Sequence, residues 1–307
     1  MEDVIVTEKI AKNYKDVLAV SELSLTVRKG EIYGFLGLNG AGKTTTIRML
    51  LGMIQPSQGK AFINGKRVYA DNLALWEKTG YLVEIPYSYP NLTVRENLEI
   101  IRRLRFLPDR SSVDKILDKL QLNAYAARKA KNLSLGNAQR LGLAKALMHN
   151  PEILILDEPA NGLDPAGIYE IRELLMDLAL NHGVTIFISS HILGEVSKFA
   201  TRIGIIHEGK LMQEVSAEDL EKLRRKRLLI NGKDKATMLS VLTRQGFSPE
   251  ETEEGILECK NNTAVDQPEN IATLLVNAGC PPTLLKVEDE DLESYFLRTI
   301  GMKGGVK

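Results

Sequence analysis

The sequence predicts an α/β protein with a largely parallel central sheet, an antiparallel β portion at its start and a small α/β domain at its end. Three observations predict this. Short, uninterrupted apolar runs recur along the first part of the chain, and such runs are typical of strands buried on both faces. Between them lie longer segments with apolar residues three and four apart, the pattern of amphipathic helices. After about residue 217, strands and helices alternate at a shorter spacing.

The first strands are separated by close turns, which favours antiparallel pairing. We expect them at residues 4–7, 24–27 and 60–63, the last followed by an Asn64–Gly65 turn. The buried strands of the parallel core come next along the chain. They are expected at residues 32–36, 153–156, 184–189 and 202–207.

A helical insertion between two core strands is expected from about residue 90 to 150. Its helices are predicted at residues 92–107, 113–120 and 138–149. The domain boundary is expected after residue 217, giving domains at 1–217 and 218–307, with the charged run 221–227 as a linker or as the end of a connecting helix. The second domain is predicted to hold strands at 228–230, 256–260 and 283–287 and helices at 236–244, 268–277 and 291–299.

Composition excludes several classes of protein. The chain carries 40 basic and 40 acidic residues, so no overall positive field draws it to nucleic acid, and no nucleic-acid partner is expected. Cys259 and Cys280 lack the spacing of a metal site, which predicts two buried thiols. No basic, apolar leader opens the sequence and no apolar run is long enough to span a bilayer. If the protein works at a membrane, a partner must hold it there.

A phosphate-binding loop follows the strand predicted at 32–36. The segment from Gly37 to Thr44 fits the pattern G-x-x-x-x-G-K-[ST], with a helical pattern after it. Glycines let successive backbone N–H groups point at one phosphate chain, and the helix start adds partial positive charge. Lys43 is expected to reach the β- and γ-phosphates of the nucleotide and Thr44 a Mg²⁺ ion. The predicted nucleotide-binding residues here are Gly37, Leu38, Asn39, Gly40, Ala41, Gly42, Lys43, Thr44 and Thr45.

Two acidic residues end the strand predicted at 153–156. Asp157 is expected to hold Mg²⁺ through water, and Glu158 to orient and deprotonate an attacking water. A second anion-binding segment precedes this strand, where Ser134 is placed to cap a helix and Gly136 leaves N–H groups exposed.

Together these motifs resemble, in order and spacing, those of ABC-transporter ATPases over about residues 4–215. The resemblance implies the P-loop NTPase fold of that family, with a RecA-like core, an antiparallel β portion and a helical subdomain. It places Lys43 and Thr44 in the Walker A loop, Asp157 and Glu158 in Walker B, and Ser134 and Gly136 in the signature motif. It further implies that Asp164 lies in the D-loop, His191 is the switch histidine and Tyr14 stacks on adenine.

Three residues depart from the usual family pattern. Leu135 replaces the first signature glycine, Asn137 replaces a glutamine, and Glu84 stands where a lid glutamine is usual. Glu84 is a candidate to approach Mg²⁺ or water, although it adds negative charge beside a triphosphate. These variants and the extra C-terminal domain resemble the bacitracin-resistance type of peptide-antibiotic exporters.

The resemblance also implies partners and location. Two cassettes, of this chain or of this chain and a relative, would close head to tail on two ATP molecules. A separate transmembrane permease would hold them at the inner face of the cell membrane, on the cytoplasmic side. Two alternatives remain open: a non-transport ABC-type ATPase and a regulatory ATP-binding cassette with little turnover. A plain P-loop kinase or GTPase fits poorly, because it needs neither the Ser134–Arg140 segment nor His191.

Overall fold

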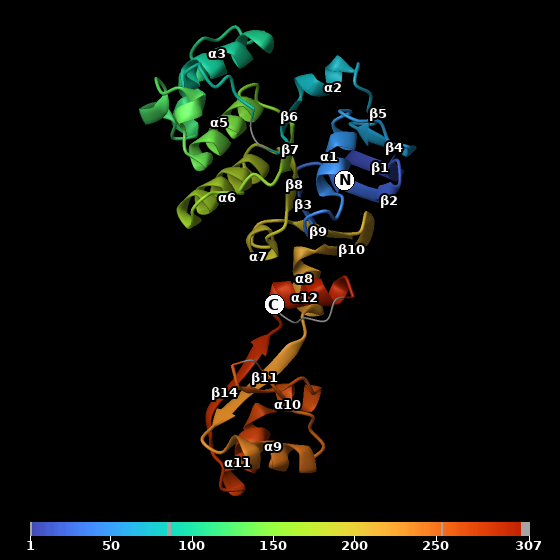
Figure 1. Cartoon of the computed structure of the whole chain (residues 1–307), viewed down its shortest axis with the longest axis vertical. Coiled ribbons are helices and arrows are strands. Elements are labelled where there is room, and N and C mark those ends of the chain that lie inside the picture. Colours follow the sequence, from blue (N-terminus) through green and yellow to red (C-terminus); the bar gives the residue numbers. More distant parts are fainter. Residues whose placement is uncertain (1, 85–86, 253, 302–307) are drawn as a thin grey trace. The chain divides into compact units, whose positions relative to one another are not determined.

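The computed structural model describes residues 2–84, 87–252 and 254–301. The chain separates into two compact units, one up to Ala217 and one from Glu218 onwards (Figure 1).

The first sheet of the first unit is antiparallel, as predicted, in the order β2-β1-β4-β5. Its strands are longer than the apolar runs suggested, because their solvent-facing residues are polar and did not contribute to those runs. They are β1 (Asp3–Tyr14), β2 (Val17–Arg28), β4 (Gln58–Ile63) and β5 (Lys66–Arg67). The Asn64–Gly65 turn has both φ angles positive, 49° and 70°, which suits the twist of a tight hairpin.

The second sheet has the order β10-β9-β3-β8-β7-β6. Its strands are β3 (Ile32–Leu36), β6 (Thr79–Leu82), β7 (Ile153–Asp157), β8 (Thr185–Ser190), β9 (Arg202–His207) and β10 (Lys210–Ser216). All neighbours pair in parallel except β9 and β10. Every residue of β3, β7 and β8 is buried, as expected for strands covered on both faces. Because β8 lies between β3 and β7, the carboxyl ends of these three strands meet at one edge.

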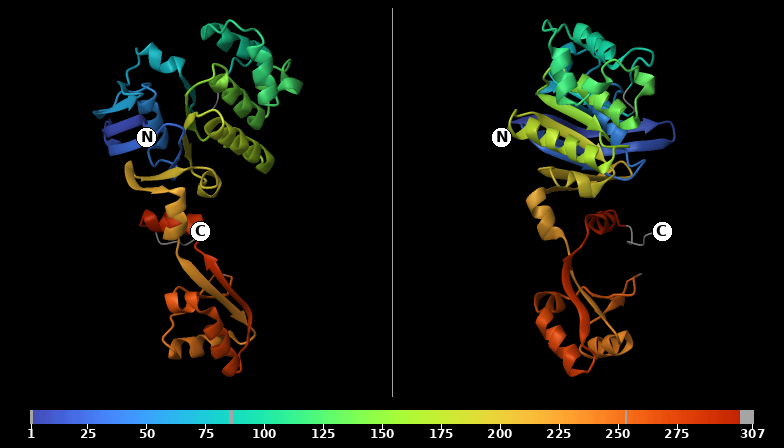
Figure 2. Two further views of the ribbon diagram at one scale, coloured as in Figure 1. Left: turned by 180° about the vertical axis from the view of Figure 1, so that it is seen from behind. Right: turned by 90° about the vertical axis from the view of Figure 1, so that its left-hand side faces the viewer.

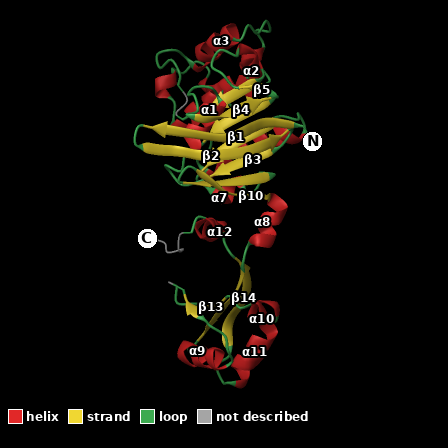
Figure 3. Ribbon diagram, turned by 90° about the vertical axis from the view of Figure 1, so that its right-hand side faces the viewer, coloured by secondary structure: helices red, strands yellow, loops and turns green. Residues whose placement is uncertain are grey.

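Helices cover the parallel sheet on both faces. The short α1 (Lys43–Leu50) packs between the two sheets, in a core that joins β1, β2, β3 and β7. On the other side lie α5 (Leu135–Leu147) and α6 (Pro165–Leu180), as Figures 1 and 2 show. The P-loop NTPase fold expected from the resemblance is therefore present. Figure 3 shows the strands of the first unit's two sheets lying together, with β1 and β2 beside β3.

The helical insertion contains α3 (Val94–Leu104), α4 (Ser112–Lys119) and α5, with two 3-10 turns, Asn123–Tyr125 and Ala130–Asn132, between α4 and α5. Thr93 and Glu96 form a reciprocal capping box at the start of α3. Helix α5 begins at Leu135 rather than at 138, because the Ser134 side chain accepts a hydrogen bond from the Asn137 N–H. Two further short helices are α2 (Leu73–Glu77) and α7 (Leu193–Val196).

The second unit contains a four-stranded sheet in the order β12-β13-β11-β14. Its strands are β11 (Lys226–Gly232), β12 (Glu250–Glu251), β13 (Leu257–Cys259) and β14 (Pro282–Asp289). Its helices are α8 (Ala217–Leu223), α9 (Lys235–Arg244), α10 (Asn262–Asp266), α11 (Pro268–Asn277) and α12 (Leu292–Thr299). Strands and helices alternate as predicted, but the described pairs are all antiparallel, because each connection returns the chain in the opposite direction. Cys259 and Cys280 are free and buried, which confirms the prediction of two thiols.

Within the described residues, no helix combines the length and apolar character needed to cross a bilayer.

Candidate functional site

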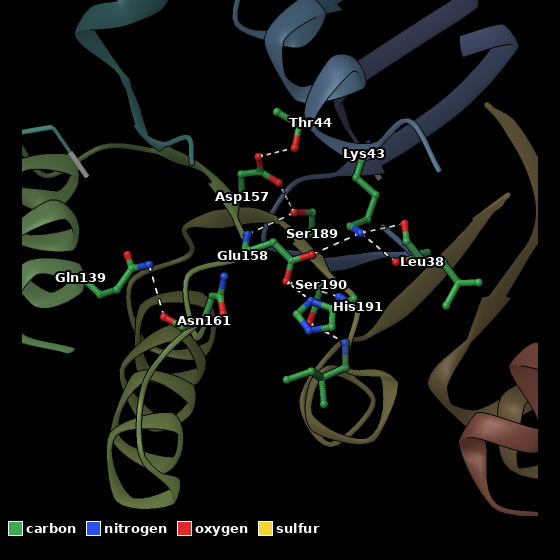
Figure 4. Close-up of polar contacts among 12 residues, drawn as sticks. Leu38, Lys43, Thr44, Gln139, Asp157, Glu158, Asn161, Ser189, Ser190 and His191 are labelled. Carbon is green, nitrogen blue, oxygen red and sulfur yellow. Dashed lines mark hydrogen bonds and ion pairs between the residues drawn. The ribbon is translucent and has the colours of Figure 1, made fainter. Parts of the chain in front are cut away.

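The phosphate loop joins β3 to α1 and curls tightly around Lys43. Gly42 has a φ of 107°, and a Cβ there would lie 2.6 Å from the Ala19 carbonyl oxygen, so only glycine fits. The Lys43 side chain is only 6% exposed, and its Nζ donates to the carbonyl oxygens of Gly37, at 2.7 Å, and Leu38, at 3.2 Å. The sequence therefore builds a ring of backbone with a buried ammonium group across it (Figure 4).

Thr44, in the first turn of α1, meets Asp157 at the end of β7. The Thr44 hydroxyl donates to Asp157 Oδ2 at 2.7 Å, and the Ser189 hydroxyl donates to Asp157 Oδ1 at 2.5 Å. Ser189 contributes because β7 and β8 pair Asp157 directly with it. The Asp157 side chain is buried, so its two oxygens are held in fixed positions. Carboxylate and hydroxyl oxygens at this spacing fit Mg²⁺, which prefers oxygen ligands and retains several waters.

Glu158 lies between a lysine and a histidine. Its Oε1 is 3.2 Å from Lys43 Nζ and its Oε2 is 2.8 Å from His191 Nδ1. Its own N–H donates to the Ser189 carbonyl and hydroxyl oxygens. Glu158 has a φ of 50°, a left-handed conformation that is uncommon outside glycine. The structure thus brings together Lys43, Glu158 and His191, which the sequence predicted separately (Figure 4).

The second predicted anion-binding segment is formed but stands apart from the loop. Ser134 caps α5, and Gly136 lies in the first turn of that helix. Within the described part of the chain, no hydrogen bond or ion pair joins this segment to the Lys43 loop. Asp164 caps α6 by accepting from the Gly167 N–H at 2.9 Å. Each helix start therefore has one of its free N–H groups satisfied by the side chain of its own N-cap residue.

Tyr14 and Glu84 occupy outer positions. Tyr14 ends β1, is 42% exposed, and has Lys12 Nζ 5.3 Å from its ring centroid. The Glu84 carboxylate is ion-paired with Arg48 at 2.5 Å rather than directed at Thr44 or Asp157. Arg48 lies one turn beyond Thr44 on α1, and its guanidinium group is the partner of the Glu84 carboxylate. The expected approach of Glu84 to Mg²⁺ stays a prediction.

Sequence reasoning missed Ser189, Arg48 and Gln139. Gln139 is buried on α5, and its Nε2 donates to the Asn161 carbonyl oxygen at 3.4 Å. Ser189 ends a strand of the expected apolar type, but its contact with Asp157 depends on which strands pair. In the sequence, Arg48 looks like an ordinary polar residue of an amphipathic helix. In each case the partner residue is distant in sequence, so no local pattern identifies the contact.

An aromatic groove, named here the α3–α5 groove, lies beside the lid position. Its lining includes Met53, Trp76, Tyr81, Tyr87, Phe106 and Lys145. Lys145 donates to Ser88 Oγ at 2.7 Å and to the Tyr87 carbonyl oxygen, and burial lowers its pKa to about 8. Burial also lowers the pKa of His149 to about 4, with a smaller contribution from Arg105. The groove thus combines exposed rings with half-buried basic groups.

The chain is similar to known ATP-binding proteins. The ABC transporter family model matches residues 20–161. The bacitracin transport ATP-binding protein BcrA of Bacillus licheniformis is 40% identical over 304 residues, which are 98% of each chain. The lantibiotic transport ATP-binding protein SrtF of Streptococcus pyogenes is 36% identical over 219 residues, or 70% of this chain and 93% of that one.

Solved structures show the same fold. A dimeric ATP-binding cassette in a post-hydrolysis state, bound to ADP and phosphate, matches with a TM-score of 0.65 and 25% identity, over 69% of this chain and 98% of that chain. A component of an ABC transporter complex from Clostridium perfringens matches with a TM-score of 0.64 and 25% identity, over 80% of this chain and 97% of that one.

Proposed function

Because this chain belongs to the ATP-binding subunits of ABC transporters, we propose that it drives export of antibiotic, peptide or drug-like molecules through a separate membrane subunit. It binds ATP and hydrolyses it to ADP and phosphate. The proposed cargo class rests on the names of the bacitracin and lantibiotic transport relatives.

One observation carries the proposed mechanism: Glu158 is held between Lys43 and His191 at the end of β7. Lys43 and the loop N–H groups would bind the β- and γ-phosphates. The phosphates would then draw Lys43 away from the loop carbonyls and from Glu158. This frees the Glu158 carboxylate to orient and deprotonate a water, while His191 keeps it in position. Tyr14 would stack on adenine.

Thr44 and Asp157 would hold a Mg²⁺ ion, Asp157 through water, and the ion would neutralise charge on the phosphates. Ser189 would keep Asp157 oriented by its hydrogen bond to the other carboxylate oxygen. Ser134 and Gly136 would act on the nucleotide of a second subunit, because they stand apart from the Lys43 loop of their own chain. Asp164 and its loop would lie at the same interface. We propose that the second subunit is another copy of this chain.

The α3–α5 groove is the proposed contact with the membrane subunit. It presents Tyr81 and Phe106, and Phe106 is 90% exposed. Exposed aromatic side chains around a groove mark protein interaction sites. Docking there would hold the chain on the cytoplasmic side, at the inner face of the membrane.

The test measures ATP binding and turnover of the purified chain. Replacing Glu158 by Gln should retain ATP binding and lower kcat by about a hundredfold or more, since general-base catalysis contributes on that order. Lys43→Ala should weaken ATP binding. Glu152→Gln is the matched control, because Glu152 pairs with Lys78 beyond the other end of β7. Undiminished turnover in Glu158→Gln would remove Glu158 as the base. Binding without turnover in the wild type would favour a regulatory cassette.

A further inference from the structure

We propose that Leu135 is a positioning residue, whose side chain locks the loop Asn161–Asp164 against the start of α5 and so fixes the turn that begins at Glu158. The inference rests on the proposed ATPase mechanism for its effect on turnover. The packing of Leu135 against the loop does not itself depend on that mechanism.

Leu135 and Gly162 pack closely against each other. A Cβ at Gly162 would lie 2.0 Å from Leu135 Cδ2 and 2.8 Å from its Cγ. The leucine side chain occupies this space and, because Leu135 is 52% exposed, it would have to rotate toward solvent to admit a residue with a Cβ at position 162. Gly162 also has a φ of 76°, so glycine is favoured there by both backbone conformation and space.

Two further contacts extend the lock along the first turns of α5. A Cβ at Gly136 would lie 3.1 Å from Leu163 Cδ2, so the loop packs closely against this turn. Gln139 donates to the Asn161 carbonyl oxygen, and its buried Oε1 has no partner among the described residues. These contacts and the Gln139 hydrogen bond join the loop to the helix start at the protein surface, so the two should move together.

The loop connects directly to the proposed base. The Asn161 N–H donates to the Glu158 carbonyl oxygen at 3.1 Å, and the Leu163 N–H donates to the Ala160 carbonyl oxygen at 3.2 Å. Glu158 is held in its left-handed conformation at the start of this turn. A displacement at Gly162 should therefore reach the Glu158 carboxylate through three residues of hydrogen-bonded backbone. Leu135, which replaces the usual signature glycine, would therefore hold this loop in place.

The experiment is a double-mutant cycle on the full chain. Gly162→Ala places a methyl group against Leu135 and should lower kcat by about tenfold or more with little change in KM for ATP, because the Lys43 loop is untouched. Leu135→Ala removes the clashing Cγ and Cδ2 and leaves a Cβ at an ordinary 3.8 Å. In the Leu135→Ala background, Gly162→Ala should cost about threefold at most, since only backbone strain remains.

Gly183→Ala is the control for backbone strain. Gly183 has a similar φ of 65°, but a Cβ there meets nothing within 4 Å. If Gly162→Ala lowers kcat by the same factor in both backgrounds, Leu135 does not act through Gly162 and the proposal falls.

A second measurement does not depend on turnover. Hydrogen exchange in the nucleotide-free chain should show faster exchange at residues 160–164 in Leu135→Ala and unchanged exchange at residues 37–44. Unchanged exchange at residues 160–164 would overturn the lock, whether or not Gly162→Ala folds. Faster exchange there, in a chain whose wild type does not turn over ATP, would keep the lock and reject the proposed ATPase mechanism instead.

Discussion

At the residue scale, an acidic side chain lies between two basic side chains in the candidate site. Lys43, Glu158 and His191 follow each other at 3.2 Å and 2.8 Å. The Lys43 side chain is buried, whereas His191 is 37% exposed. The Glu158 carboxylate is therefore paired with Lys43 and His191, and these pairings would be exchanged when a triphosphate binds. Partner exchange of this kind places the carboxylate without exposing an unpaired buried charge.

The Arg48–Glu84 pair explains how a carboxylate is tolerated at the lid position. We expect Arg48→Met to raise KM for ATP by about twofold to fivefold at low salt, the range of an exposed ion pair. The reason is that Glu84 would then repel the triphosphate without compensation. The effect should shrink in high salt. Arg48→Met combined with Glu84→Gln should restore KM, and a double variant as weak as Arg48→Met would contradict this.

His149 should make stability depend on pH. Burial lowers its pKa to about 4, so between pH 4 and 6.5 the unfolded chain binds more protons than the folded chain. Stability therefore rises with pH across this window and is lost as pH falls through it. Allowing for partial exposure, His149→Gln should recover about 1–2 kcal/mol at pH 4.5 relative to pH 7.5. Urea unfolding measures this, with exposed His182→Gln as control. Equal losses in wild type and His149→Gln would refute it.

At the element scale, α5 joins two functional regions. Its first turn carries Ser134 and Gly136, and its later turns present Gly142, Lys145 and Ala146 to the α3–α5 groove. Lys145 also holds Tyr87 and Ser88, just after the lid position. A rigid helix of this length can carry a displacement from one end to the other. We expect that closure of the two subunits on ATP is transmitted to the α3–α5 groove through α5.

Phe106 tests whether the groove receives the membrane subunit. Phe106→Asp should weaken association with the membrane subunit by about tenfold or more, as for a central aromatic contact, while leaving basal ATP turnover unchanged. Its φ of 54° is well tolerated by aspartate, so folding should be retained. Leu180→Asp is the control, because Leu180 is 74% exposed on α6 and lies outside the groove. Equal association of the two variants would place the contact elsewhere.

At the scale of the whole molecule, the two anion-binding segments predict association of two chains. In Glu158→Gln with ATP and Mg²⁺, light scattering should give twice the 34.1 kDa of one chain, because ATP joins the subunits and is not hydrolysed. Lys43→Ala, which should not bind ATP, is the negative control. A single-chain mass in Glu158→Gln with saturating ATP would exclude the homodimer and favour pairing with a different ATPase subunit.

The amino-acid sequence alone predicted the P-loop fold, four of the six strands of the second sheet and the residues that the proposed chemistry requires, but it predicted neither β6 nor β10. The features that it predicted each rest on a local pattern: the spacing of Gly37–Thr44, the apolar run before Asp157 and Glu158, and the cap at Ser134. Such patterns follow from backbone geometry over a few residues and do not depend on distant partners. The lengths of β1 and β2 were underestimated, because their exposed polar residues carry no apolar signal.

Which side chains contact each other becomes visible in the folded structure. Ser189 orients Asp157 because β8 lies beside β7, and Arg48 compensates Glu84 because the fold brings α1 within ion-pair distance of this carboxylate. The antiparallel pairing of the second unit and the fit of Leu135 over Gly162 were likewise invisible in the sequence. These contacts join residues far apart along the chain. Their formation depends on strand order and close packing of the whole core, which no local pattern encodes.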